Sequence, residues 1–318
     1  MHIARFLVAP VAGLLALAGC SAPSATTSSA PATAQLAVSA AFYPFQFVAE
    51  RIGGDQVAVT NLTPPGAEPH DLELAPKEVA GLGEADLVIF QHGFQPAVDS
   101  AIETVKPKRT VDTASFLKLR ESEEEHEEGD HGDEHEEEGE EHEHGANDPH
   151  TWLDPTNMVA IAERVRDALS EARPEAKDAF AANAQALIGD LTTLDGEFKT
   201  GLTTCERKVF ITSHEAFGYL AARYGLEQVG IRGVDPQTEP TAARIAEVQK
   251  VAKQHKVTTI FFETLVSPAV STSIAGDLKL TTDVLDPLEG LTQDSRGTNY
   301  LEVMRSNLAS LQKANGCS

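Results

Sequence analysis

The stretch Asp86-Leu87-Val88-Ile89-Phe90 decides the fold class. An acidic residue followed by a short apolar run is typical of a strand that is buried on both faces, as in a parallel sheet. A similar run, Val209-Phe210-Ile211-Thr212, lies in the second half of the chain. Segments with apolar residues at helical spacing separate these runs from other strand-like segments. The alternation predicts an α/β fold of two lobes, each with a mostly parallel sheet flanked by helices.

A long helix is expected to join the two lobes. The segment 174–202 carries apolar residues three or four apart, at Phe180, Ala184, Leu187, Leu191, Leu194 and Phe198. At 1.5 Å per residue this helix is about 42 Å long, which exceeds the width of one small domain. Further strands are predicted at 36–39, 57–62, 110–112, 259–262 and 282–285, and further helices at 43–52, 76–82, 157–171, 215–224, 241–255, 268–278 and 300–314.

The N-terminus has the pattern of a secretory signal. Arg5 precedes an apolar run at 6–18, which is too short to span a bilayer as a helix. The ending Leu17-Ala18-Gly19-Cys20 resembles a bacterial lipobox, which implies cleavage before Cys20 and a lipid on its sulfur. An ordinary signal with a coincidental cysteine is the alternative. We expect an extracytoplasmic protein that is lipid-anchored to the bacterial cell membrane.

These observations predict a chain of five segments. A lipoprotein signal peptide at 1–19 is followed by a flexible, Ser/Thr/Ala/Pro-rich tether at 20–35. The predicted folded segments are an N-terminal α/β lobe at 36–155 with a His- and acid-rich disordered loop at 121–147, a helical segment with the linker helix at 156–203, and a C-terminal α/β lobe at 204–318.

The charge of the chain is concentrated in that loop. The formal net charge is −24, and residues 121–146 hold fifteen acidic residues and five histidines without a Lys or Arg. Removing those fifteen charges leaves −9, an ordinary acidic protein. Because phosphate binding needs clustered cations, this balance excludes a nucleic-acid binder.

Two cysteines remain beyond Cys20. In an oxidising compartment, Cys205 and Cys317 are candidates for a disulfide that pins the C-terminal helix to the strand beginning near residue 207. Two free, buried thiols are the alternative.

Three histidines and one carboxylate share a structural context. His70 ends the loop after the 57–62 strand, His214 follows the 209–212 strand, and His150 precedes a helix. Asp286 follows the last predicted strand. Ligands of open α/β sheets bind at the carboxyl ends of strands, so the fold can bring these four residues together.

Three imidazoles and one carboxylate suit tetrahedral Zn²⁺, whereas a carboxylate-richer set suits Mn²⁺ better. A single histidine is more often a core or surface residue with ordinary hydrogen-bond partners than a metal ligand. The context that these three histidines share favours the metal site. His92 follows a strand in weaker surroundings, and His255 is expected to face solvent.

Four motifs in combination resemble the metal-binding lipoproteins of zinc ABC importers, the ZnuA-like proteins. They are Gly66-Ala67-Glu68-Pro69-His70-Asp71, Asp148-Pro149-His150-Thr151-Trp152-Leu153-Asp154-Pro155, Thr212-Ser213-His214-Glu215-Ala216-Phe217-Gly218-Tyr219 and Val284-Leu285-Asp286-Pro287-Leu288.

The resemblance implies that His70, His150 and His214 bind Zn²⁺, and a histidine at the third position favours zinc over manganese. In the family the fourth ligand is this C-terminal Asp, a Glu beside the first His, or water. Pro69 stands where that Glu would be and Glu68 is displaced by one residue, which favours Asp286. The family also implies little closure between the lobes.

The loop histidines are candidates for weak secondary zinc sites, because carboxylates gather cations and imidazoles supply nitrogen ligands. A gathering or sensing role is one hypothesis, and a solvated tail of charge is the other. The histidines are His126, His131, His135, His142 and His144.

We therefore expect a monomer that captures Zn²⁺ between its lobes and delivers it to an ABC-type permease in the membrane, and not an enzyme. Alternatives are an importer component of the same fold for Mn²⁺ or Fe²⁺, a zinc-binding adhesin or chaperone, and a zinc hydrolase. The sequence lacks the His-Glu-x-x-His and Gly-x-Ser-x-Gly motifs of hydrolases. Glu215 is better explained by the dipole at the start of the predicted 215–224 helix than as a catalytic base.

Overall fold

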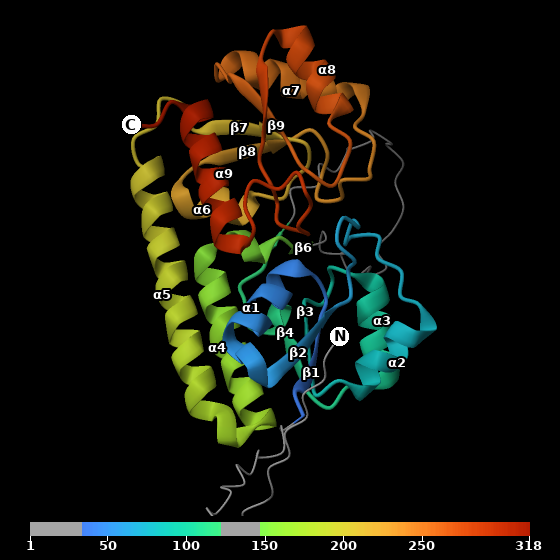
Figure 1. Cartoon of the computed structure of the whole chain (residues 1–318). Helices are drawn as coiled ribbons and strands as arrows, with labels where there is room; N and C mark the ends of the chain where they lie inside the picture. The colour runs from blue at the N-terminus through green and yellow to red at the C-terminus, as the bar shows by residue number, and fades with distance from the viewer. Residues whose placement is uncertain (1–33, 122–146) are drawn as a thin grey trace, which may run out of the picture. The chain divides into compact units, whose positions relative to one another are not determined.

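Two four-stranded parallel sheets form the framework of the protein (Figure 1). The first has the order β2-β1-β3-β4 and the second the order β10-β9-β7-β8. We call the parts built on them the N-terminal lobe and the C-terminal lobe. The strands are β1 Leu36–Ala40, β2 Val57–Asn61, β3 Leu87–Phe90, β4 Thr110–Asp112, β7 Val209–Thr212, β8 Glu227–Gly230, β9 Thr259–Phe262 and β10 Thr281–Val284. The predicted α/β fold is confirmed.

The computed structural model describes residues 34–121 and 147–318, and residues from Gln35 onward form one unit. The predicted signal peptide, Cys20, nearly all of the tether and the five loop histidines lie outside the described residues. The predicted lobe boundaries at 155/156 and 203/204 stay predictions. Within the described residues, no helix is both long enough and apolar enough to cross a bilayer.

Helices cover both sheets. They are α1 Tyr43–Gly53, α2 Pro76–Glu84, α3 Pro96–Val105, α4 Pro155–Ala172, α5 Lys177–Leu202, α6 Gly218–Tyr224, α7 Ala242–Gln254, α8 Ala269–Leu278 and α9 Tyr300–Asn315, with single 3₁₀ turns at Gly54–Gln56, Thr113–Ser115, Thr151–Leu153 and Pro174–Ala176. Most predicted elements are found within a few residues of their expected bounds.

The differences are α3 and β8, which the sequence analysis did not predict, and the start of α6. That helix begins at Gly218 and not at Glu215, because the N–H of Glu215 donates to the carbonyl of Gly233 in a neighbouring loop, at 2.9 Å. The Glu215 carboxylate pairs with Arg244 at 2.7 Å. The interpretation of Glu215 as an acidic residue of a helical first turn is therefore wrong.

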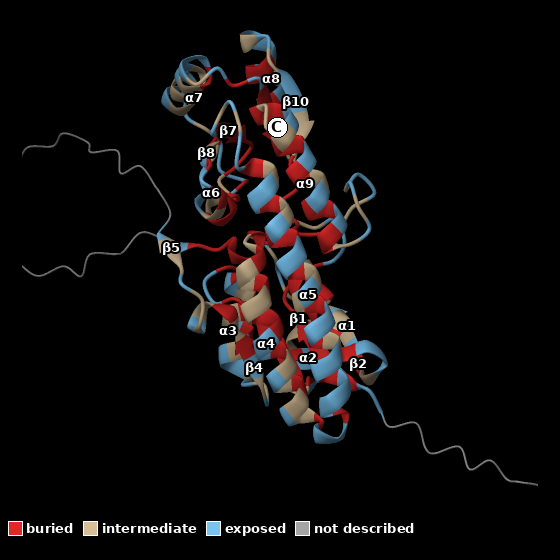
Figure 2. Cartoon of the chain, turned by 90° about the vertical axis from the view of Figure 1, so that its left-hand side faces the viewer, coloured by how far each residue is buried: buried red, intermediate tan, exposed pale blue. Residues whose placement is uncertain are grey.

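Helix α5 connects the lobes by packing against α1 and α4 on one side of the junction and α6 and α9 on the other (Figure 1). Its six predicted apolar positions are all fully buried, and exposed residues alternate with buried ones along it (Figure 2). Burial of each Leu or Phe side chain among them contributes roughly 1.5–3 kcal/mol. Arg51 of α1 and Arg305 of α9 add ion pairs to Asp190 and Glu197, at 2.7 and 2.8 Å. Helix α5 thus shares buried side chains with both lobes.

Two short antiparallel strands bracket the acidic segment. They are β5 Arg120–Glu121 and β6 Asn147–Asp148, with Glu121 opposite Asn147. The segment therefore leaves and re-enters the fold at neighbouring positions, and β6 runs directly into Pro149 and His150.

Cys205 and Cys317 form the predicted disulfide, with a sequence separation of 112 residues. Backbone hydrogen bonds join the same two segments, from Arg207 N to the Asn315 carbonyl and from Ser318 N to the Thr204 carbonyl, both at 3.0 Å. The bond fastens the end of α9 beside the start of β7.

Replacing both cysteines by serine is expected to lower the free energy of unfolding by up to about 4–5 kcal/mol, because the bond restricts a long loop in the unfolded chain. Urea denaturation with and without reductant measures the loss. In reductant, the free energy of unfolding of wild type should fall to that of the double variant. Reductant should not change the free energy of unfolding of the double variant. A wild-type midpoint that does not respond to reduction would contradict the prediction.

Candidate metal centre

Four side chains from distant parts of the chain converge between the two sheets. His70 comes from the irregular segment between β2 and α2, His150 follows β6, His214 follows β7, and Glu289 lies in the loop after β10. Their nitrogen and oxygen atoms all lie within 4.8 Å of one another. The side chains of His150, His214 and Glu289 are at most 1% exposed and that of His70 is 11% exposed. The site is nearly closed to solvent.

The spacing of these atoms fits a small tetrahedral cation. Glu289 Oε1 lies 3.4 Å from His70 Nε2, 3.2 Å from His150 Nε2 and 3.4 Å from His214 Nε2. The last two nitrogens are 3.3 Å apart. A tetrahedron with ligands about 2.0–2.1 Å from its centre has edges of about 3.3 Å. The residues present therefore suit Zn²⁺ in donor type and number, and four of the six distances between their atoms match such a tetrahedron.

Two of the three imidazoles are held in place by carboxylates that contact their Nδ1 atoms. The Nδ1 of His150 donates to Asp148 Oδ1 and the Nδ1 of His214 donates to Glu263 Oε1, each at 2.8 Å. A neutral imidazole with its hydrogen on Nδ1 presents a lone pair on Nε2. Both rings are thereby held in the form that binds a metal through Nε2.

Two glutamine side chains from the segment between β3 and α3 hold the segments that carry the candidate ligands. Gln91 donates to the carbonyl of Pro149 and accepts from the hydroxyl of Thr151, on either side of His150. Gln95 donates to the carbonyl of Pro69, at 3.2 Å, beside His70. Both glutamines are buried.

Trp152 connects the His150 segment to the Glu289 loop. Its indole N–H donates to the carbonyl of Pro287 at 2.7 Å, and its own carbonyl accepts from the Tyr300 hydroxyl at 2.6 Å. Trp152 is fully buried, so this contact ties ligands of both lobes together through the core.

The structure groups Glu289, and not the predicted Asp286, with the three histidines. Asp286 is buried but used elsewhere: its carboxylate accepts from Leu288 N at 2.8 Å and from Ser295 Oγ at 2.9 Å. Leu288 has a positive φ of 60°, and this turn brings Glu289 to the centre. The candidate fourth ligand is corrected accordingly.

The pKa values follow the same contacts. Burial lowers the pKa of His150 and His214, but Asp148, Glu263 and Glu289 outweigh it and the net pKa of both is raised. Burial lowers the pKa of the His70 imidazole. Burial alone raises the pKa of Glu289, but hydrogen bonds from the histidines hold it well below its usual range. An incoming cation replaces protons as the positive charge facing Glu289.

The other histidines of the described residues lie away from this group. The side chain of His92 is 64% exposed, with Asp99 at 3.5 Å, and His255 directly follows the end of α7. Neither histidine belongs to the four-residue group, in agreement with the weaker sequence contexts of both.

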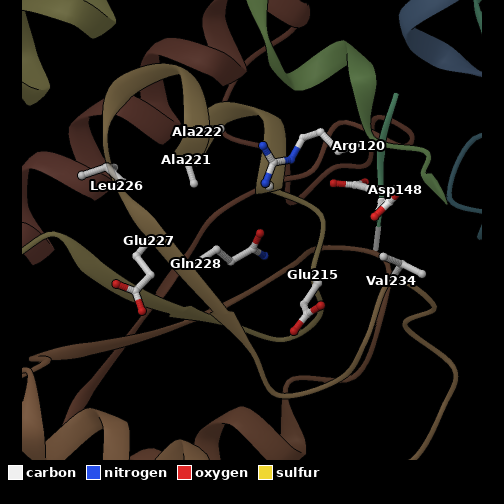
Figure 3. A pocket seen from close by; sticks show the side chains of 11 residues that line it. Arg120, Asp148, Glu215, Ala221, Ala222, Leu226, Glu227, Gln228 and Val234 are labelled. Carbon is white, nitrogen blue, oxygen red and sulfur yellow. The ribbon is translucent and has the colours of Figure 1, made fainter. Parts of the chain in front are cut away.

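A pocket of about 180 Å³ lies beside the centre, between the base of the acidic segment and the C-terminal lobe (Figure 3). Arg120, Asp148, Glu215 and Gln228 are among the residues that line it. Asp148 thus both lines this pocket and contacts the imidazole of His150.

Comparisons with known proteins agree with this geometry. The chain is 37% identical over 294 residues to the zinc-binding lipoprotein AdcA of Streptococcus pneumoniae strain R6. The aligned region covers 89% of this chain and 56% of AdcA. The chain thus spans about half the length of that relative. It is 36% identical over 304 residues to the high-affinity zinc uptake system protein ZnuA of Bacillus subtilis, covering 94% of this chain and 93% of that protein.

Solved structures show the same fold. The Zn(II)-bound ZnuA-like domain of S. pneumoniae AdcA matches with a TM-score of 0.72 at 34% identity, covering 89% of this chain and 99% of that one. The laminin-binding protein Lmb of Streptococcus agalactiae, described as bifunctional with adhesin and metal transporting activity, matches with a TM-score of 0.75 at 28% identity, covering 88% and 99%. The family described as zinc-uptake complex component A, periplasmic, matches residues 38–314. This chain belongs to the ZnuA family.

Proposed function

We propose that this protein captures one Zn²⁺ ion with His70, His150, His214 and Glu289 and delivers it to an ABC-type permease in the membrane. The observation that carries the proposal is the convergence of three Nε2 atoms and one carboxylate oxygen at tetrahedral spacing inside the fold. Membership of a zinc-uptake family supports zinc as the cargo.

The arrangement supports binding over catalysis. Catalytic zinc sites keep an open position for water or substrate, whereas four protein ligands fill a tetrahedron. The near-complete burial of three of the four groups leaves little room for a substrate. We therefore assign no catalytic role to Glu215, which is paired with Arg244.

The protein acts as a monomer outside the cytoplasm, held to the membrane by a lipid on Cys20. The predicted signal peptide and lipobox support this location, and relatives named as lipoproteins agree with it. A tethered binding protein stays close to the permease that receives its ion.

The acidic segment gathers zinc through weak sites that include His126, His131, His135, His142 and His144. Its composition supports this role, and only residues 147–149 separate it from His150 in the sequence.

Replacing residues 122–146 by an Asn-Gly turn is expected to leave one tightly bound zinc ion per chain and to remove the weak sites. Because Glu121 and Asn147 already pair in antiparallel register, a two-residue turn can close the gap. Elemental analysis after dialysis and titration with zinc measure both classes of site. Loss of the tight ion would contradict the proposed function, and an unchanged number of weak ions would contradict the gathering role.

An adhesin is the second candidate, because Lmb combines adhesin and metal transporting activity in its description. Growth of a deletion strain in a zinc chelator separates the two functions. An importer component is needed under scarcity, and zinc restores growth, whereas an adhesin that never meets a permease leaves growth unchanged. Competition between Zn²⁺, Mn²⁺ and Fe²⁺ for the purified protein tests the choice of cargo.

A further inference from the structure

We infer that Glu263 is a positioning residue for metal capture, which holds the imidazole of His214 with Nε2 toward the centre. This inference rests on the proposed function and assigns a role to a residue outside the four candidate ligands. Glu263 enters the chemistry only through His214 and is not itself a ligand.

The position of Glu263 in the sheet brings it to His214. Strand order β10-β9-β7-β8 reverses between β9 and β7, which is where open α/β sheets build their sites. Glu263 directly follows β9, and Ser213 and His214 directly follow β7. The paired ends of these two strands thus place the carboxylate beside the ring.

The contacts of Glu263 converge on a single oxygen. Its Oε1 accepts from Nδ1 of His214 at 2.8 Å and from the hydroxyl of Ser213 at 2.5 Å. Its Oε2 is buried without a hydrogen-bond partner among the described residues, and the side chain is 1% exposed. Within the described residues, the hydrogen bonds of the Glu263 side chain thus come from His214 and its neighbour Ser213.

The buried position of the Glu263 carboxyl group indicates a functional role. A buried carboxylate without a cationic partner is costly, and within the described residues no Lys or Arg forms an ion pair with Glu263. Contact with His214, at 2.8 Å, offsets that cost most when the imidazole donates electron density to a divalent ion through its other nitrogen. The carboxylate therefore favours the state in which His214 binds the cargo.

Asp148 accepts a hydrogen bond from Nδ1 of His150, as Glu263 does from His214, but it also makes other contacts. Its Oδ1 also accepts the backbone N–H of His150, and its Oδ2 lies against Gly218. Loss of Asp148 would disturb the local backbone together with the ring. Glu263 contacts its ligand only through side chains, so its replacement isolates the effect on the ring.

Two variants separate the hydrogen bond of Glu263 from its charge. Glu263→Gln keeps an oxygen that can accept from Nδ1 but loses the charge, and Glu263→Leu loses both. Zinc affinity is expected to fall by about 10-fold in the first and about 100-fold in the second. Glu247→Gln is the matched control, because Glu247 pairs with Arg244 on α7 away from the centre, and it should bind zinc as wild type does.

Nitrogen chemical shifts of the His214 ring give a readout that a purely structural role would not move. In the zinc-free protein, at a pH high enough for the ring to be neutral, wild type and Glu263→Gln should show the hydrogen on Nδ1, and Glu263→Leu should show a mixture with the hydrogen on Nε2. Wild-type zinc affinity in Glu263→Leu, or lost affinity with an unchanged His214 ring, would overturn the inference. If Glu263→Leu does not fold, unchanged affinity in Glu263→Gln overturns it instead. If wild type itself does not bind zinc, the proposed function is refuted, whereas the hydrogen bond between Glu263 and His214 is not.

Discussion

His214→Ala is expected to lower zinc affinity by about 10²–10³-fold. Structural zinc sites with four ligands bind with about 10–16 kcal/mol in total, so that one ligand accounts for roughly 3–4 kcal/mol, and each 1.4 kcal/mol is about a factor of ten. The substitution also leaves the buried Glu263 without the imidazole that donates to it. Competition against a chromogenic chelator measures the affinity, and thermal unfolding with excess zinc should show a smaller gain in Tm than in wild type.

His92→Ala is the matched control for this experiment. His92 also lies just after a strand, but its side chain is 64% exposed and it is not part of the four-residue group. The variant should bind zinc with wild-type affinity. Equal affinities for His214→Ala and wild type would show that the centre is not the zinc site, whatever His92→Ala does.

The sequence predicts the three histidines because their signal is local. His214 stands just after an apolar strand and His70 lies in the segment that follows another strand, and the carboxyl ends of parallel strands meet at one edge of a sheet. The same reasoning places the buried faces of α4 and α5, where apolar residues recur at helical spacing and are fully buried. The hydrophobic pattern and the expected sheet topology are therefore enough to predict the three histidines and the buried faces of these helices.

Glu289 could not be predicted in this way, because it lies beyond the strand end and a turn at Leu288 with positive φ directs it inward. Nothing in the sequence marks that non-glycine residue as left-handed. Glu263 did carry a usable signal, since it follows the apolar strand 259–262 directly, as His214 nearly does after its own strand. The short edge strand β8 was missed because it begins with two polar residues and ends at a glycine, and α3 was missed although Pro96 stands at its first turn.

Glu289→Gln and Asp286→Asn are expected to have opposite outcomes. The first removes the only anion among the four converging groups and should lower zinc affinity by about 10²-fold or more, since about 3 kcal/mol per ligand is lost. The second keeps an oxygen that accepts from the Leu288 N–H, and its amide NH₂ can donate to the Ser295 hydroxyl, so zinc affinity should stay close to that of wild type. The two residues are three positions apart in one loop, so each variant controls for general disturbance of that loop.

Asp286 also differs from Glu289 in its protonation. Burial raises the pKa of Asp286 to about 6, whereas the histidines hold that of Glu289 well below its usual range. Glu289 is therefore the carboxylate that faces the centre as an anion, and neutralising it removes charge that the cation would meet. A zinc affinity that falls in Asp286→Asn and stays unchanged in Glu289→Gln would reverse the assignment and restore Asp286 as the ligand. Chelator competition on both proteins at the same pH decides between them.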